Sequence, residues 1–398
     1  MASLLLHLRP LTPAASASGR SPRPGLSLPP RSRRLRLLPA LQCVAAPGPA
    51  PPSAPPPRWH AALAAAAGLY AAYVTAGAAV AVARPEAFRW FVALAPGSYT
   101  CALGFIMLAM GFTLRLGDFA ALLRDRPLAI LFGCAAQYTI MPALGAIVSR
   151  VLGLPPSLSA GLILLGCCPG GTASNVVVQV TLVAKGDVPL SIVMTVCSTL
   201  AAVFLTPLLT KVLAGAYIPV DAVKLSLSTL QVVVAPILLG SSIQSAFPSV
   251  VKFVTPFAPL LAVLASSLLA CSVFSENFVR LRSTIASNGN GNIFSGDIGV
   301  VMLSVCLLHF AGFFVGYAVA AIGGLEERQR RAISIEVGMQ NSSLGVVLAT
   351  AHFSSPLVAL PPALSAVIMN IMGSTLSLVW QNITPSVLED ETSDKPNA

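Results

Sequence analysis

Two polar, glycine-containing stretches interrupt segments of this chain that are otherwise apolar and long enough to cross a membrane. They are Cys168-Pro-Gly-Gly-Thr-Ala-Ser-Asn175 and Glu336-Val-Gly-Met-Gln-Asn-Ser-Ser343. Backbone that leaves a helix inside hydrocarbon must be buried in protein or line a wet cavity, because lipid offers it no hydrogen-bond partner. Paired broken helices in corresponding places of two halves are typical of a transporter binding site.

The composition indicates a polytopic membrane protein. Apolar residues make up 55% of the chain and charged residues 10%, whereas soluble domains have about a quarter charged residues. A bilayer core of about 30 Å needs about 20 apolar residues per helix. On that scale we predict an all-α protein of ten spans, near residues 59–83, 97–114, 127–148, 157–184, 188–213, 226–247, 255–275, 298–322, 331–351 and 356–380.

Ten spans divide into two halves of five, at residues 59–213 and 214–384. The first spans of the halves and the two broken motifs share an offset of about 167 residues, and an odd number of spans per half predicts an inverted repeat. The longest loop, residues 275–297, is expected to be mobile, and residues 385–398 form a disordered tail. Basic residues in alternate loops leave the membrane orientation open.

Residues 1–58 form a basic leader. They hold eight of the 24 Lys and Arg residues and no Asp or Glu, so the formal charge of +10 belongs largely to this segment and does not indicate nucleic-acid binding. Arg- and Ser-rich, acid-poor leaders are typical of transit peptides, and the many prolines favour a plastid address over a mitochondrial one. A cut near 43–46 is plausible, and a disordered cytosolic tail is the alternative.

Cysteine and histidine residues show no ligand spacing. Seven of the eight cysteines stand at apolar positions, which favours packing over disulfides or metal binding. His60, His309 and His352 are scattered along the chain, so no zinc constellation is predicted. The spans also lack a convincing nucleophile beside a histidine, or a pair of intramembrane aspartates, so a membrane-embedded hydrolase is disfavoured.

The first interrupted stretch combines a helix breaker with polar residues. Pro169 removes a backbone donor, and Gly170 and Gly171 tolerate unusual dihedral angles. Thr172, Ser174 and Asn175 then stand at the start of a half-helix, where free N–H groups favour an anion and side-chain oxygens suit a hard cation. The alternative is a proline kink whose small residues let two helices approach closely.

The second stretch contains Glu336, the only acidic residue deep within a predicted span. A carboxylate near the bilayer centre costs about 3 kcal/mol or more unless a cation, a proton or a cavity compensates it. The alternatives are an ion pair between Glu336 and Arg330 or Arg331, or a contact between helices made by the protonated Glu336 side chain. Gln137 could equally form a hydrogen bond between helices or serve as a ligand. Ser191 and Thr195 are four residues apart and share a helix face, where such hydroxyls ordinarily donate to carbonyls of their own helix.

These motifs resemble the bile acid:sodium symporter family, and within it the plastid sodium/metabolite cotransporters. The resemblance covers about 59–380, with its most specific pieces at 137–142, 168–175, 185–191 and 336–343. It implies a ten-helix fold with a panel domain (spans 1, 2, 6 and 7) and a core domain (spans 3–5 and 8–10), in which spans 4 and 9 are broken and cross.

The resemblance also implies ligands, carried over by matching position. One sodium ion would be held by Ser174, Asn175, Ser191, Thr195 and Glu336, and a second by Gln137, Glu336, Gln340 and the carbonyls of Val337 and Met339. Thr172, Asn341 and Asn370 would face the substrate. Between Asn175 and Ser191, this chain has about three more residues than the family pattern, around 177–179. Three residues add nearly one helical turn, so the roles of Ser191 and Thr195 are in question.

The sequence therefore predicts a non-enzymatic secondary transporter. It would couple sodium entry to the movement of a small organic anion, such as a 2-keto acid, a pantoate-like acid or another monocarboxylate, across the chloroplast envelope. Its partners would be that substrate and membrane lipid. A proton-coupled carboxylate transporter of the same fold, or a membrane receptor or scaffold without transport, are the alternatives. The cargo, the transport direction, the sodium stoichiometry and the oligomeric state are left open.

Overall fold

The computed structural model describes residues 58–114, 124, 127–171, 174–287 and 297–383, which all belong to one unit that begins at Pro56. The predicted tail, and the leader except its last residue, lie outside this range. Regular structure in the described residues is helical, apart from one backbone bridge between Gly170 and Gln340. The predicted all-α class is confirmed.

Each of the ten predicted spans coincides with helix. Among the described residues, six segments are long and apolar enough to cross a membrane. They are α6 (Pro127–Val151), α9 (Val188–Ala214), α10 to α11 (Ala222–Ala246), Ala258–Val279 of α13 (Ala258–Ser287), Gly299–Ile322 of α14 (Asp297–Ile322), and η3 with α17 (Pro356–Gln381). There are eight if two bent pairs count as spans: α1 (Arg58–Gly68) with α2 (Tyr70–Ala83), bent by 52°, and η1 and α3 (Pro85–Val92) with α4 (Gly97–Thr113), bent by 85°.

The other two predicted spans are the interrupted ones. Residues 157–184 form α7 (Pro156–Cys167) and α8 (Ser174–Val183), and residues 331–351 form α15 (Glu327–Gly338) and α16 (Ser342–His352). The predicted helix breaks are therefore both present. Because each half-helix is short, these segments fall outside the set of single long helices.

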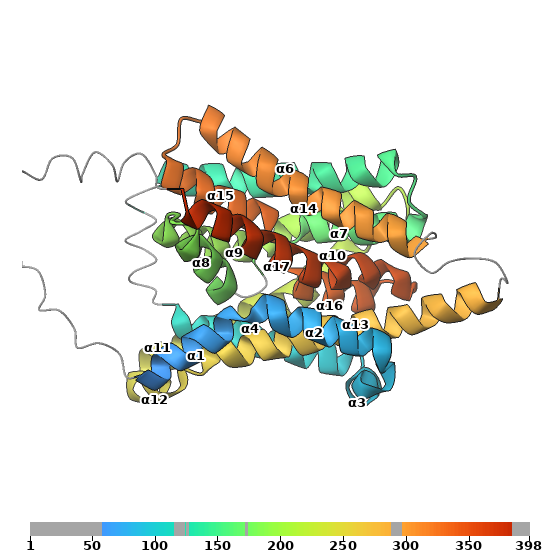
Figure 1. Ribbon diagram of the computed structural model, residues 1–398, viewed down its shortest axis with the longest axis horizontal. Helices are drawn as coiled ribbons and strands as arrows, with labels where there is room; N and C mark the ends of the chain where they lie inside the picture. Colours follow the sequence, from blue (N-terminus) through green and yellow to red (C-terminus); the bar gives the residue numbers. More distant parts are fainter. Residues whose placement is uncertain (1–57, 115–123, 125–126, 172–173, 288–296, 384–398) are drawn as a thin grey trace, which may run out of the picture. The chain divides into compact units, whose positions relative to one another are not determined.

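The helices form two layers (Figure 1). We call α1, α2, α4, α11 (Ala235–Ala246) and α13 the panel layer, in which α13 packs on α2 and α4, and α11 packs on α4. We call α6 to α9 and α14 to α17 (Leu360–Gln381) the broken-helix layer, in which α14 packs on α15, α6 and α17, and α9 packs on α6 and α7. Each layer combines helices from both halves of the chain.

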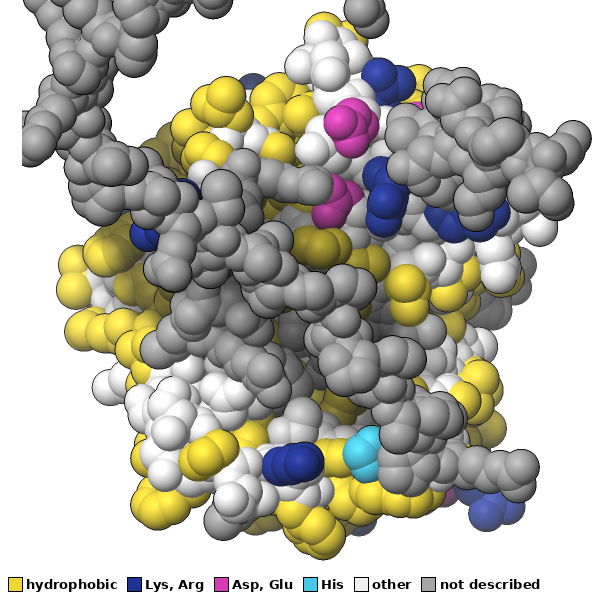
Figure 2. Space-filling view, turned by 90° about the vertical axis from the view of Figure 1, so that its left-hand side faces the viewer, with side chains coloured by type: hydrophobic (Ala, Val, Ile, Leu, Met, Phe, Trp, Pro, Cys, Tyr) yellow, Lys and Arg dark blue, Asp and Glu magenta, His cyan; other side chains and the backbone are white. Residues whose placement is uncertain are grey.

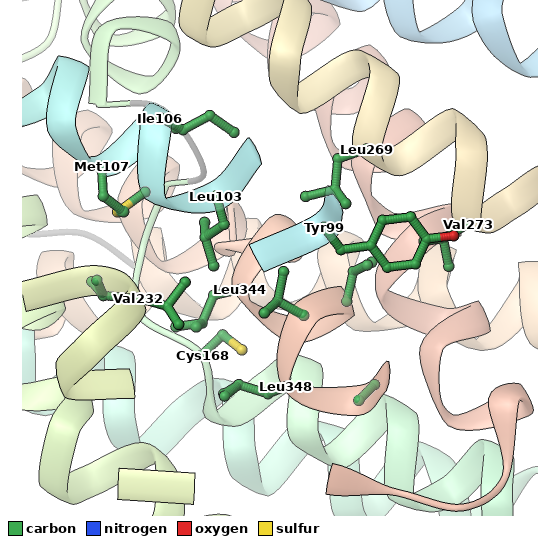
Figure 3. Close-up of a cluster of buried hydrophobic side chains, with 14 of the residues drawn as sticks. Tyr99, Leu103, Ile106, Met107, Cys168, Val232, Leu269, Val273, Leu344 and Leu348 are labelled. Carbon is green, nitrogen blue, oxygen red and sulfur yellow. The ribbon is translucent and has the colours of Figure 1, made fainter. Parts of the chain in front are cut away.

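Apolar side chains join the two layers (Figure 3). Leu103 and Met107 of α4 and Leu269 of α13 belong to one buried cluster with Leu344 and Leu348 of α16. The second half-helix of the second break is thus in direct contact with the panel layer. A movement of one layer past the other must change this contact.

The prediction of a loop at 275–297 is wrong for its first half. Helix α13 continues through Ser287, because the segment after Ser275 contains no glycine or proline until the Asn-Gly repeats that begin at Asn288. Asn277 is buried here and donates from Nδ2 to the carbonyl of Val273, 2.9 Å away. Residues 288–296 lie outside the described part of the chain.

Charged side chains mark one end of the protein. Figure 2 faces the end at which α14 and α17 finish and α15 begins, and Lys, Arg, Asp and Glu side chains gather in its upper part. At this end the backbone N–H of Asp187 donates to the carbonyl of Arg328 at 2.9 Å. Asp187 also caps α9, since Oδ1 accepts from the N–H of Leu190 at 3.1 Å. The first turns of α9 and α15 are therefore fixed against each other.

Candidate functional site

The two breaks lie against each other and exchange backbone hydrogen bonds. The N–H of Gly171 donates to the carbonyl of Met339 at 2.8 Å, and the N–H of Asn341 donates to the carbonyl of Pro169 at 2.8 Å. These bonds flank the antiparallel bridge between Gly170 and Gln340. Groups that would otherwise be unpaired inside a membrane protein are thereby paired across the two halves of the chain.

Glycine is required at the first break for two different reasons. At Gly170, a Cβ atom would lie 2.6 Å from Oε2 of Glu336 and 3.1 Å from its carbonyl oxygen. At Gly171, the backbone has a φ of +63°, in the left-handed region that favours glycine. The predicted role of these residues, to open the helix, is extended by a second one: they let the Glu336 carboxylate approach the backbone.

Glu336 is buried, with 1% of its surface exposed. Its Oε1 accepts hydrogen bonds from the hydroxyls of Ser191, at 2.7 Å, and Thr195, at 2.6 Å. Its Oε2 has no hydrogen-bond partner among the described residues. A buried carboxylate with neutral hydroxyls at one oxygen and no described hydrogen-bond donor at the other calls for a cation or a proton.

The neighbouring arginines are paired with a different acid. Arg331 Nε lies 2.8 Å from Oε1 of Glu327, and Arg330 Nη1 lies 3.8 Å from its Oε2. Arg331 also donates from Nη1 to the carbonyl of Ala184 at 2.9 Å and to that of Trp380 at 3.1 Å, at the ends of α8 and α17. The alternative in which Arg330 or Arg331 neutralises Glu336 is therefore wrong.

Two glutamines stand beside the carboxylate. Gln137 of α6 donates from Nε2 to the carbonyl of Cys168, at 3.2 Å, and to Oε1 of Gln340, at 3.0 Å. Its Oε1 lacks a hydrogen-bond partner within the described ranges. Nε2 of Gln340 donates to the carbonyl of Val337 at 2.8 Å. The carbonyls of Val337 and Met339 thus accept one bond each, and each retains a second lone pair.

The structure brings together seven of the nine predicted ion ligands. They are Gln137, Ser191, Thr195, Glu336, Val337, Met339 and Gln340. Ser174 begins α8 and Asn175 follows it, but their side chains lie outside the described residues. The extra residues near 177–179 do not carry Ser191 and Thr195 away, because both hydroxyls reach Glu336.

The predicted substrate residues have different surroundings. Thr172 lies outside the described residues. Asn341 is buried and caps α16, since its Oδ1 accepts from the N–H of Leu344 at 2.9 Å, while its Nδ2 lacks a partner in the described part of the chain. Asn370 of α17 is buried and donates from Nδ2 to the carbonyl of Ala366 in its own helix, at 2.6 Å.

Sequence reasoning missed His309 of α14. Its Nδ1 lies 2.7 Å from the carbonyl oxygen of Gly338, the last residue of α15, and its Nε2 lies 2.8 Å from Oγ of Ser365. Because a carbonyl only accepts, Nδ1 carries the proton. A lone histidine inside an apolar span was the available signal, but only the fold shows that it supports the second break.

The donor set of this site is one of oxygen atoms. A carboxylate, two hydroxyls, two side-chain amides and backbone carbonyls converge in a buried place, and hard cations prefer such ligands. Within the described residues there is no group of three His, Cys, Asp or Glu side chains that could hold a metal. The unpartnered oxygens of Glu336 and Gln137 could accept a cation, and the N-terminus of α16 beside Asn341 favours an anion.

Comparisons with known proteins show the family of this chain. Residues 100–283 match the model of the Sodium Bile acid symporter family. The chain is 44% identical over 318 residues to the "Probable sodium/metabolite cotransporter BASS1, chloroplastic" of Arabidopsis thaliana, covering 80% of this chain and 74% of the relative. It is 39% identical over 298 residues to the "Uncharacterized sodium-dependent transporter YocS" of Bacillus subtilis (strain 168), covering 74% and 85%. This chain belongs to the sodium bile acid symporter family.

Proposed function

We propose that this protein is a secondary transporter that couples the entry of sodium to the movement of a small organic anion. The observation that carries the proposal is the buried Glu336 carboxylate, which lies between the two helix breaks and has an oxygen without a partner in the described structure. The relatives named as sodium/metabolite cotransporters and as a sodium-dependent transporter support this function, which is not enzymatic.

We assign two sodium sites that share Glu336. One would use Ser191 and Thr195 with Ser174 and Asn175, and it is supported by the two hydroxyls that contact Oε1. The second would use Gln137, Gln340 and the carbonyls of Val337 and Met339, and it is supported by the unpartnered Oε1 of Gln137. Sodium would supply positive charge beside the Glu336 carboxylate and the C-terminal ends of α7 and α15.

The anion would bind next to these ions. The α16 terminus and the unpartnered amide of Asn341 support a carboxylate there, and Thr172 and Asn370 are further candidates. Sodium that orders the breaks would raise substrate affinity, and substrate would raise sodium affinity by the same factor. If two sodium ions accompany one monovalent anion, each cycle moves net charge, worth about 2.3 kcal/mol per charge per 100 mV.

The ten-span inverted repeat with panel and core domains is part of the proposal. Its support is that both breaks fall in the broken-helix layer and that each layer draws helices from both halves of the chain. Alternating access would then follow from movement of the broken-helix layer against the panel layer, past the contact between α4 and α16. The leader and the chloroplastic relatives support a plastid envelope location.

Uptake into proteoliposomes tests this function. Purified protein would be reconstituted, and pyruvate, other 2-keto acids, pantoate and glycolate offered with an inward gradient of sodium or of potassium at fixed pH. We expect accumulation of at least one anion with sodium only. Equal uptake with both cations that is lost when any pH difference across the membrane is collapsed would favour proton coupling through Glu336. No accumulation of any anion would favour a receptor or scaffold.

A further inference from the structure

A groove runs along the broken-helix layer between α14 and α17, and its walls include none of the predicted ion or substrate residues. It has a volume of about 560 Å³, and its walls include Phe310, Phe313 and Phe314 of α14 and Ile371 of α17. Phe310 and Phe314 are 64% and 67% exposed, and Ile371 is 44% exposed. Both helices are long and apolar enough to span a membrane, so the exposed apolar side chains of this groove are suited to contact with hydrocarbon.

The hydroxyl groups of the groove are already used within the protein. Ser334 donates to the carbonyl of Phe313 at 2.6 Å, and Thr375 donates to the carbonyl of Ile371 at 2.8 Å. Tyr317 donates to Oε2 of Glu327 at 2.7 Å. The remaining wall is predominantly aliphatic and aromatic, so it suits an occupant that is apolar along its length.

One end of the groove lies at the membrane boundary. Tyr317 and Trp380, near the ends of α14 and α17, have ring centroids 5.7 Å apart, and such aromatic pairs mark the interface. Tyr317 follows Phe310 by two helical turns, which carries the groove roughly 10 Å into the hydrocarbon. This end belongs to the charged face in Figure 2.

The charges at that end do not cancel. The single carboxylate of Glu327 is shared by two guanidinium groups, those of Arg330 and Arg331, so the cluster carries one net positive charge. The Arg330 side chain is 32% exposed, whereas that of Arg331 is 2% exposed. Arg330 is therefore the cation that a headgroup can reach from the membrane surface.

We propose that this groove binds one acyl chain of an anionic membrane lipid, with the headgroup beside Arg330. The inner wall connects the groove to the second break. Phe313 lies so close to Gly338 that a Cβ atom there would overlap its ring, and a Cβ at Gly316 would lie 3.0 Å from Val337. A chain seated against Phe313 would support the packing of α14 on α15. This site is independent of the ion and substrate sites, so it stands whatever the cargo.

Fluorescence of Trp380 tests the acyl-chain site directly. The chain contains three tryptophans, so the Trp59→Phe, Trp90→Phe protein keeps Trp380 alone as a reporter in the groove wall. This full-length protein would be placed in phosphatidylcholine vesicles with a few per cent of phosphatidylglycerol or phosphatidylcholine that carries brominated acyl chains. We expect brominated phosphatidylglycerol to quench Trp380 at least threefold more than brominated phosphatidylcholine at the same mole fraction.

Variants assign the effect to the groove. Thr375→Phe and Ile371→Phe fill it from exposed positions and should reduce the quenching to the phosphatidylcholine level, while Leu378→Phe, on the same helix but outside the lining, should not. Arg330→Gln should abolish the lipid preference, and Arg328→Gln, also exposed, should keep it. The proposal would be overturned if both lipids quenched Trp380 equally and neither filling variant changed the quenching, because the lipid would then contact the protein only as non-specific boundary lipid. A preference that survives Arg330→Gln would overturn the headgroup assignment.

Discussion

The two helix breaks meet at one point but are held open in different ways. At the first, Pro169 has no N–H to donate, and Gly171 has a φ that other residues rarely adopt, so the local sequence favours the end of α7. At the second, no proline occurs between Glu336 and Ser343. There α15 ends at Gly338, whose carbonyl bonds to His309 of α14. One break is therefore favoured by breakers in its own segment, whereas the other has no proline and is supported by a neighbouring helix.

Their chemistry differs in the same way. Within its described side chains, at 168–171, the first break contributes backbone groups and space, because Gly170 leaves room for the carboxylate. The second contributes Glu336 and Gln340, which carry the charge and the amide oxygen of the site. Changes at Glu336 and Gln340 should thus remove ligands, and changes at Pro169 and Gly170 should disturb their fit.

Glu336→Ala should reduce sodium-dependent uptake to background, a loss of about 100-fold or more, because the buried charge that balances the ions is gone. Radiolabelled anion uptake in proteoliposomes measures the effect, and the exposed acid Glu326, replaced by Gln, is the matched control. Uptake at the wild-type rate by Glu336→Ala would remove this residue from the mechanism.

Gly170→Ala should raise the sodium concentration for half-maximal uptake about 10-fold. The added Cβ would lie 2.6 Å from Oε2 of Glu336, and overpacking of this kind costs about 1–3 kcal/mol. Gly104→Ala is the control, since no atom lies within 4 Å of a Cβ at that position. Equal sodium dependence in the two variants would show that the carboxylate does not need the space above Gly170.

His309→Ala should lower the thermal stability and raise the half-saturating sodium concentration about fivefold. Removing the ring leaves the Gly338 carbonyl without that donor, at a cost of about 1–3 kcal/mol. His352→Ala is the comparison, because this half-buried histidine contacts Ser228 at the far end of α16. Thermal unfolding in detergent with and without sodium measures both variants, and the same sodium-induced shift in each would argue against a support role for His309.

Pro169→Ala should have the smallest effect, less than about threefold on half-saturating sodium. The substitution removes the penalty of ~3 kcal/mol that a proline imposes inside a helix, so α7 could continue past Cys168. Gly170, Gly171 and the bonds to Met339 and Asn341 still hold the backbone out of the helix. Sodium titration of uptake measures it beside Gly170→Ala. A larger effect for Pro169→Ala would show that the proline, and not the bridge, holds this break.

The sequence predicted both breaks and the charge at their centre. Pro169 and the glycines are local signals, and an acid within an apolar span is conspicuous without any structure. It did not predict the length of α13, where no breaker separates the membrane span from the helix that follows. Nor did the sequence settle whether Ser191 and Thr195 reach the site. The three extra residues before them, relative to the family pattern, could have turned both hydroxyls to another helix face, but in the structure both contact Glu336.

What the sequence determined by itself was which segments are apolar enough to span a membrane, where one of them must break, and that a carboxylate is buried. These follow from composition and from backbone restrictions that act within a few residues. The tertiary structure decided which groups meet. It brought the hydroxyls of Ser191 and Thr195 on α9 to Glu336 of α15, and it brought His309 of α14 to the end of α15. These pairings join residues from different helices, and such contacts are set by packing, which no local pattern encodes.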